Sequence, residues 1–337
     1  MLSSLLLAVL PLLVVSQDVV VQTSLGPVSG SLRNTTKGRP YYSFQGLPYA
    51  APPVGPLRLL PPQPPNTWTE VLDLSADSQV MCPQLSETVT GDLLGQEDCL
   101  YLNIYAPVME SDSLLPVMVF IYGGGFITGS DRAEEYGPSR WLEEEVLVVT
   151  LNYRLYSLGF MSLGTSHAPG NQVSHSLRRL QLTEIHLEGL LDQSLALRLV
   201  KDNVREFGGD PGRVTLMGQS AGSSSALYHL MSPQSEGLFQ QIIAQSGSNF
   251  SPSLHSITAS EAARFGIEAS IALGCVLGDG EDRRLECLQG VDLEKFVRLN
   301  SVLGVNLKPN EDAEYAENPF LPMSPMEALR TGRLQLR

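Results

Sequence analysis

The stretch that decides the fold is Gly218-Gln219-Ser220-Ala221-Gly222. The apolar residues 214–217 precede it at the length of a buried strand, and residues 223–231 follow it as a helix of small residues and Leu. A tight strand-to-helix turn of this kind is a nucleophile elbow, which holds its serine in a strained backbone conformation with the hydroxyl exposed. The positions two before and two after that serine must lack side-chain bulk, which glycine supplies. The turn therefore predicts a nucleophile at Ser220.

Composition bounds the class of protein. The chain has 337 residues and 43% hydrophobic content, enough for one large α/β domain or two smaller ones. Its formal charge of −14 argues against nucleic acid and anionic membrane surfaces as partners, and it also fits ordinary solubility.

The N-terminus has the pattern of a targeting segment. Residues 1–15 are an uncharged run rich in Leu and Val, too short to span a bilayer and followed at once by polar residues. This predicts a secretory signal peptide over residues 1–16, a mature chain from Gln17, and a secreted protein. No later stretch reaches 18 consecutive apolar residues, so we expect no transmembrane segment.

The four cysteines are an even set in a chain with a predicted signal peptide, which favours disulfides. Proximity in sequence favours Cys82 with Cys99 and Cys275 with Cys287. Three pairings are formally possible, and four buried free thiols are the alternative. Two sequons are candidate glycosylation sites, at Asn34 and Asn249.

The rest of the chain alternates strands and helices. Residues 18–32 alternate apolar and polar residues around a Gly-Pro pair, which predicts a β-hairpin. Residues 41–65 are dense in Pro and Gly, which argues against both a helix and a central strand. Further elements are expected as buried strands over 117–121 and 146–151, as a strand over 239–244, and as helices over 190–207 and 324–331. This alternation indicates a doubly wound α/β fold.

A second glycine-rich turn, Tyr122-Gly123-Gly124-Gly125-Phe126, follows the predicted strand over 117–121. Consecutive glycines let backbone N–H groups approach a ligand closely, which is how an oxyanion hole is made without side chains. An isolated run of three glycines is more commonly a flexible turn. Here the run follows a strand and precedes an elbow, which favours the oxyanion hole.

Several long motifs, over residues 96–105, 117–129, 146–160 and 207–248, agree in order and spacing with one family. Through them the chain resembles the type-B carboxylesterase and cholinesterase family of α/β-hydrolases. The resemblance covers essentially the whole mature chain and implies one hydrolase domain over residues 17–337. It implies an α/β-hydrolase fold with a mostly parallel central sheet and helices on both faces, incomplete at the C-terminus.

The resemblance also implies roles for individual residues. The oxyanion donors would be the amides of Gly124, Gly125 and Ala221. No metal and no cofactor is implied. Two structural ion pairs are implied as well, Arg58 with Glu97 and Arg154 with Asp192.

The sequence departs from the family at two places. Residues 173–188 separate two segments that the family joins almost directly, so we expect an insertion there. Its His175 and His186 precede Ser220, whereas the order of the fold is serine, acid, histidine, so we read them as incidental. The chain also stops at Arg337, before the expected triad acid and histidine. Neither remaining candidate, His229 or His255, fits a family motif.

The expected function is that of a secreted carboxylic ester hydrolase, in which Ser220 attacks a small-molecule ester and forms an acyl-enzyme. The alternatives are a non-catalytic, neuroligin-like adhesion or scaffold protein, and a truncated product without activity. Gln219 stands where cholinesterases carry a Glu, and no Trp lies between residues 82 and 99, so a choline ester is not expected. The elbow resembles that of arthropod juvenile hormone esterases and of other carboxylesterases. The sequence does not indicate an oligomeric state.

Overall fold

A computed structural model describes residues 19–86, 91–108, 113–164, 189–251, 253–275, 281–303, 308–314, 316 and 318–335. The predicted signal peptide and the predicted insertion over 173–188 lie outside these residues. Within the described ranges, no helix combines the length and the apolar character that crossing a membrane would require.

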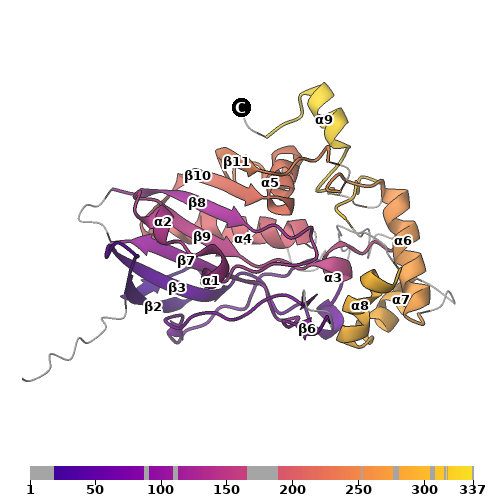
Figure 1. The fold of residues 1–337 in the computed structure, drawn as a ribbon, viewed down its shortest axis with the longest axis horizontal. Coiled ribbons are helices and arrows are strands. Elements are labelled where there is room, and N and C mark those ends of the chain that lie inside the picture. Colours follow the sequence, from indigo (N-terminus) through magenta and orange to yellow (C-terminus); the bar gives the residue numbers. More distant parts are fainter. Residues whose placement is uncertain are drawn as a thin grey trace, which may run out of the picture.

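A central sheet organises the molecule, with its main strands in the order β1-β2-β3-β7-β9-β8-β10-β11 (Figure 1). A short strand, β4, pairs with β2. The strands of this sheet are β1 (Val19–Gln22), β2 (Pro27–Asn34), β3 (Pro40–Pro48), β4 (Leu72–Asp73), β7 (Tyr101–Pro107), β8 (Leu115–Ile121), β9 (Leu147–Leu151), β10 (Gly209–Gln219) and β11 (Gln241–Gln245). A separate two-stranded ribbon pairs β5 (Gln84–Leu85) with β6 (Leu93–Leu94).

The sheet is mixed, and the expectation of a mostly parallel sheet holds only for one half of it. Strands β9, β8, β10 and β11 are parallel neighbours, whereas β1, β2, β3, β7 and β9 pair antiparallel. Short turns join β1 to β2 and β2 to β3, and a short turn can only join antiparallel strands. A parallel pair needs a longer crossover, such as the segment between β8 and β9.

Strand β3 contradicts the prediction that residues 41–65 contain no central strand, because it lies between β2 and β7. Its prolines, Pro40 and Pro48, stand at the two ends of the strand, where they interrupt no pairing. Gly46 has φ +83° and lies where the register shifts between Gln45 and Leu47. The Pro and Gly residues therefore bound and bend the strand without preventing it.

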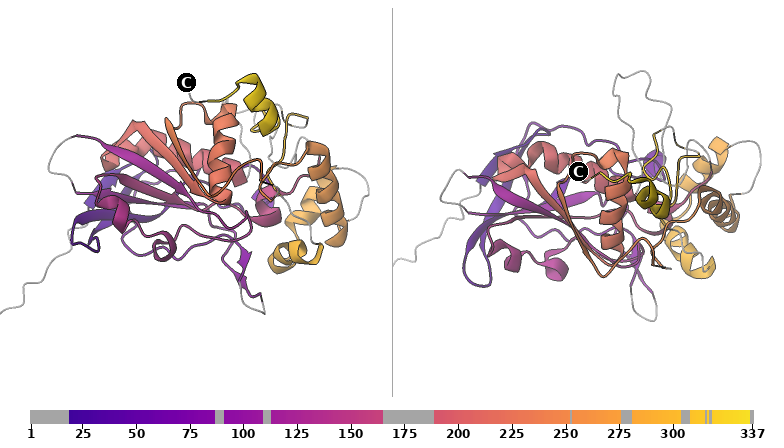
Figure 2. Two further views of the ribbon diagram at one scale, coloured as in Figure 1. Left: turned by 45° about the horizontal axis from the view of Figure 1, so that its top comes forward. Right: turned by 90° about the horizontal axis from the view of Figure 1, so that it is seen from above.

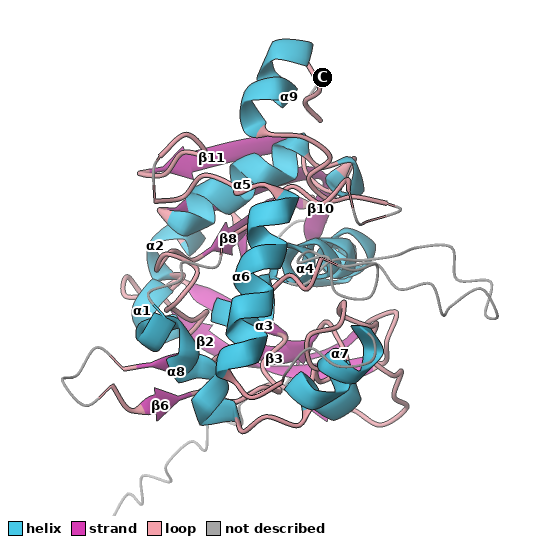
Figure 3. Ribbon diagram, turned by 90° about the vertical axis from the view of Figure 1, so that its right-hand side faces the viewer, coloured by secondary structure: helices cyan, strands magenta, loops and turns pink. Residues whose placement is uncertain are grey.

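Helices cover both faces of the sheet, as predicted. They are α1 (Ala133–Tyr136), α2 (Ser139–Leu142), α3 (Tyr156–Phe160), α4 (Gly189–Asn203), α5 (Ala221–Met231), α6 (Ala259–Ala272), α7 (Glu281–Gln289), α8 (Leu293–Leu303) and α9 (Pro325–Thr331). Figure 3 shows α1 and α2 on one side of the sheet and α4 on the other. Helices α6, α7 and α8 gather beyond one end of the strands (Figure 1 and Figure 2).

The core divides between the two faces because successive strand residues point in opposite directions. Val119, Val149 and Leu216 pack in the large cluster that includes residues of α4. Their neighbours Met118 and Val148 belong to a smaller cluster with residues of α1 and α2. Strands β8 and β9 are thus apolar on both sides, which explains their continuous hydrophobic runs and confirms them as buried strands. Strand β11 forms as predicted, but it lies at the edge of the sheet and most of its residues are exposed.

Candidate active site

The elbow is a single residue, Ser220, between the end of β10 and the start of α5. Its φ of 56° and ψ of −119° are rare for a residue with a side chain, and such strain persists only where the surroundings fix it. The Ser220 N–H donates to the carbonyl of Gln245 on β11 at 2.8 Å, and the Ser220 carbonyl accepts from Ser224 N–H at 3.1 Å. Ser220 is half-buried, and within the described part of the chain its Oγ has no hydrogen-bond partner.

Three glycines make the turn sterically possible. A Cβ on Gly218 would lie 2.1 Å from the carbonyl oxygen of Gly222, and a Cβ on Gly222 would lie 2.1 Å from that of Ile121. Gly247, just after β11, is equally constrained, because its Cβ would lie 2.1 Å from the Ser220 carbonyl oxygen. Sequence reasoning missed Gly247, whose only signal is its place after the strand that borders the elbow.

The glycine loop folds back beside this turn. Gly124 and Gly125 have φ values of +97° and +65°, the region that glycine adopts at no steric cost. The Gly124 carbonyl accepts from the N–H groups of Ile127 and Thr128 at 3.0 and 3.1 Å. A Cβ on Gly123 would lie 3.0 Å from the Ser220 Cβ, so the loop packs directly against the elbow.

The structure leaves the predicted donors available. Among the described residues, none accepts a hydrogen bond from the amide of Gly124, Gly125 or Ala221. Ala221 is the first residue of α5 and is fully buried. The first amides of a helix have no partner within the helix and carry its partial positive charge. Unpaired donors and a serine hydroxyl therefore border the same turn.

The histidines lie elsewhere. His229 is buried near the end of α5, where Nδ1 is 2.7 Å from Ser235 Oγ and Nε2 is 3.0 Å from Gln193 Oε1. Burial lowers the pKa of His229 to about 3, so the ring is neutral at physiological pH. His255 is exposed, with Nδ1 3.3 Å from the carbonyl of Ser251. Neither histidine contacts Ser220, in line with their absence from the family motifs.

The structure joins Cys82 to Cys99 and Cys275 to Cys287, and the described part of the chain holds no free cysteine. The linked cysteines are 17 and 12 residues apart in sequence. The first link joins Cys82, two residues before β5, to Cys99, two residues before β7.

Each disulfide closes a short loop, and the chain-entropy estimate for such a loop is about 3 kcal/mol. We expect the double variant Cys275→Ser/Cys287→Ser to lose about this much free energy of unfolding, measured by urea denaturation. Peptide mapping without reduction should find both links in the wild-type chain. A cross-link between the two pairs would contradict the assignment.

Both predicted ion pairs are present and bidentate. Arg58 contacts Glu97 through Nε and Nη2, each at 2.6 Å from a carboxylate oxygen. Arg154 contacts Asp192 through Nε at 2.9 Å and Nη2 at 2.7 Å, and its backbone N–H donates to the same carboxylate at 3.0 Å. The side chains of Arg154 and Asp192 are only 3% and 0% exposed. This second pair fixes the start of α4 to the segment before α3.

The two sequons differ in exposure. Asn34 is exposed at the end of β2, where a glycan would meet solvent. Asn249 is 2% exposed, and in the described part of the chain neither polar atom of its side chain has a hydrogen-bond partner. A buried side chain leaves no room for a glycan, so Asn34 is the accessible candidate.

Sequence reasoning also missed a buried carboxyl group, Asp131, just after the glycine loop. Asp131 is 1% exposed, and among the described residues neither carboxyl oxygen makes a hydrogen bond of ordinary geometry. Its backbone carbonyl accepts from Asn103 Nδ2 at 3.1 Å and Thr150 Oγ1 at 3.0 Å. Burial raises the pKa of Asp131 well above its ordinary value of 3.8.

This raised pKa predicts a pH dependence of stability. The unfolded chain releases the Asp131 proton at lower pH than the folded chain, so folding loses stability as pH rises from about 4 through the folded pKa. Asp131→Asn removes this loss. We therefore expect the variant to be more stable than the wild type at about pH 8 and to gain less at about pH 4. Urea unfolding at about pH 4 and 8 checks this, and a gain that is the same at both values would contradict it.

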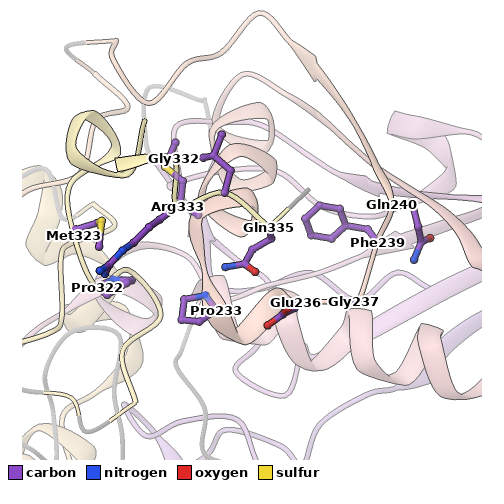
Figure 4. Close-up of a pocket in the computed structure, with 12 residues that line it drawn as sticks. Pro233, Glu236, Gly237, Phe239, Gln240, Pro322, Met323, Gly332, Arg333 and Gln335 are labelled. Atoms are coloured by element: carbon purple, nitrogen blue, oxygen red, sulfur yellow. The ribbon is translucent and has the colours of Figure 1, made fainter. Parts of the chain in front are cut away.

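A pocket of about 990 Å³ lies away from the elbow (Figure 4). It opens between the end of α5 and the C-terminal segment over residues 332–335, and its charged lining residues are Glu236 and Arg333. Ser220 does not line it.

In the described ranges, no cluster of three or more His, Cys, Asp or Glu side chains is placed to hold a metal ion.

Comparison with known proteins gives a family match over nearly the whole chain. A family model described as "Carboxylesterase family" matches residues 17–336. The juvenile hormone esterase of Tribolium castaneum is 36% identical over 326 residues, covering 93% of this chain and 52% of the relative. A carboxylic ester hydrolase of Bombus ignitus is 37% identical, with 93% and 53% covered, and an acetylcholinesterase of Gallus gallus is 41% identical, with 80% and 34% covered. The chain thus spans about half the length of the first two relatives.

Proposed function

Because this chain belongs to the carboxylesterase family of α/β-hydrolases, we propose that it carries the nucleophile and the oxyanion hole of a secreted carboxylic ester hydrolase. In this proposal residues 17–337 form one hydrolase domain. The observation that carries it is the strained Ser220, whose hydroxyl, without a partner among the described residues, borders the amides of Gly124, Gly125 and Ala221, which are likewise unpaired there.

The reaction would proceed in two halves. Ser220 Oγ attacks the carbonyl carbon of the ester while a base removes the hydroxyl proton, and the carbonyl oxygen becomes an oxyanion. The three amides donate to this oxyanion, which bears more charge than the substrate carbonyl, so they stabilise the transition state more than the substrate. The intermediate then expels the alcohol, which takes up the proton, and water hydrolyses the acyl-enzyme in the same way.

The base and its orienting acid are proposed to come from outside the described residues. His229 has both ring nitrogens engaged and His255 lies in an exposed loop, so neither can serve Ser220. The relatives are about twice as long as this chain, which leaves room for both groups in a protein of their length.

The substrate proposal stays at the level of a small-molecule carboxylic ester. The names of the relatives refer to different ester substrates, so they do not indicate which ester this chain would bind. A choline ester is not proposed, because Gln219 replaces the Glu of cholinesterases.

Secretion is supported by the two disulfides, which persist in oxidising compartments. A non-catalytic scaffold would require neither the strained serine nor the unpaired amides.

The test uses a chain extended to the length of the relatives. In this extended chain, residues 17–337 are followed by the part of the Tribolium castaneum relative that comes after the aligned region. We expect a fluorophosphonate probe to label Ser220, identified by peptide mass spectrometry, and the label to vanish in Ser220→Ala. Ser224→Ala, on the same helix, should keep it. Labelling that survives Ser220→Ala would overturn the proposal.

A further inference from the structure

Gln84, in the small strand β5, makes four hydrogen bonds with its side-chain amide. Its Oε1 accepts from Thr128 Oγ1 at 2.8 Å and from the Gly129 N–H at 2.9 Å. Its Nε2 donates to the carbonyls of Gly129 at 2.8 Å and Cys82 at 3.1 Å. Both amide protons are used. The backbone partners also fix which way the amide points, because an N–H and a carbonyl cannot exchange roles.

These bonds hold the far end of the glycine loop. Thr128 donates its N–H to the Gly124 carbonyl, and its own carbonyl oxygen lies 2.0 Å from where a Cβ on Gly124 would be. Thr128 and Gly124 are therefore in direct contact, and the position of one sets the position of the other. Glycine adopts many backbone conformations, so Gly124 and Gly125 would not keep these φ values without contacts from outside the loop.

The support is rigid. Gln84 is only 5% exposed and lies opposite Leu94 in the β5–β6 ribbon. Two residues before it, Cys82 is fully buried and linked to Cys99. A side chain anchored in this way can transmit the position of the ribbon to the loop.

We infer that Gln84 is a positioning residue, which holds the glycine loop so that the amides of Gly124 and Gly125 face Ser220. This inference rests on the proposed function, because only an oxyanion requires the amides to be placed there. Removing a whole oxyanion donor lowers turnover by about 100- to 1,000-fold. Loosening two donors without removing them should therefore lower it by about 10- to 100-fold.

Two variants separate the bonds from the packing. Gln84→Glu keeps the size of the side chain and its acceptors, but its carboxylate cannot donate to the carbonyls of Gly129 and Cys82. Gln84→Met keeps the length and loses all four bonds. The matched control is Gln234→Met, because Gln234 is 6% exposed and donates to the Asn318 carbonyl at 2.7 Å near the other end of α5.

The first measurement needs no activity. Hydrogen exchange of the Ile127, Thr128 and Gly129 amides, which are hydrogen-bonded in the loop, is followed in residues 17–337. We expect protection to fall at least about tenfold in both Gln84 variants and to stay unchanged in Gln234→Met. Lowering the pH should restore protection in Gln84→Glu, because a protonated carboxyl regains a donor, and should not restore it in Gln84→Met.

The second measurement is the rate of fluorophosphonate labelling at Ser220 in the extended chain, with kcat and KM for a p-nitrophenyl ester. We expect labelling and kcat to fall about 10- to 100-fold in the Gln84 variants, with KM little changed, since the donors act in the transition state. Unchanged loop protection, or lowered protection with unchanged labelling, would overturn the inference. If the wild-type extended chain does not label at Ser220, the proposed function fails, and with it the claim that Gln84 positions donors, while the exchange result still decides whether Gln84 holds the loop.

Discussion

Residues 17–337 expressed alone are expected to hydrolyse p-nitrophenyl acetate about a millionfold more slowly than the extended chain. Losing the base of a serine hydrolase costs about this factor, because a serine hydroxyl is a weak nucleophile until its proton is removed. In the described residues nothing accepts the Ser220 proton, and the nearest candidate on α5, His229, is bonded to Ser235 and Gln193. Stopped and continuous assays of the two chains at equal concentration measure the ratio.

The serine variant separates residual catalysis from background. In residues 17–337, Ser220→Ala should change turnover little, because oxyanion donors without an activated nucleophile give only modest acceleration. In the extended chain the same substitution should remove nearly all activity. Rapid turnover by residues 17–337 that depends on Ser220 would show that a base is present within this chain and would contradict the prediction.

Replacing Asp192 by Ala is expected to lower the free energy of unfolding by about 3–5 kcal/mol, the largest stability effect we predict. The substitution leaves the guanidinium of Arg154, which is 3% exposed, without its carboxylate. It also leaves the Arg154 backbone N–H without its acceptor. An unpaired charge in the interior costs several times what the pair itself contributes, because the charge has lost its hydration. Urea denaturation of the variant and the wild type gives the difference.

Two controls test whether burial is the cause. Arg264 and Glu268 form an exposed pair on α6 at 3.1 Å, and Arg264→Ala should change stability by no more than about 0.5 kcal/mol. The double variant Arg154→Met/Asp192→Leu removes both charges and should recover much of the loss. If Asp192→Ala costs no more than Arg264→Ala, the buried pair does not have the structural role assigned to it.

The fold could be predicted well where sequence patterns have a single physical meaning. Continuous apolar runs predicted the buried strands β8 and β9, since only a strand covered on both faces needs them. The elbow glycines were identified because the turn leaves no space for a Cβ at Gly218 or Gly222. Strand β3 was missed because Pro and Gly were counted over the whole of residues 41–65, whereas every proline of that range stands at or after Pro48, the last residue of the strand. The antiparallel β1–β2 hairpin was predicted, but the antiparallel pairing of β3 with β2 and β7 and of β7 with β9 was missed, because these pairings are set by tertiary structure.

The nucleophile and the glycine loop of the site could be predicted, but the buried side chains around them could not. Ser220 and the glycine loop lie in short motifs whose spacing carries their chemistry. Gln84 contacts the loop, and Asp131 becomes buried, only when the chain has folded. Neither residue belongs to a local sequence pattern. The burial of Asn249 could not be predicted either, because a sequon shows the sequence required for glycosylation but not whether the side chain is exposed.

The contacts of the elbow also determine when it can exist during synthesis. The Ser220 N–H needs the Gln245 carbonyl, and Gly222 packs against the Ile121 carbonyl, so segments about a hundred residues apart must meet first. The strands β1, β2, β3 and β7 pair largely with neighbours close in sequence and can assemble while later residues are still being made. The turn can therefore reach its strained form only after Gln245 has been made, and we expect a nascent chain that ends before β11 to lack the hydrogen bond that holds Ser220 in this backbone.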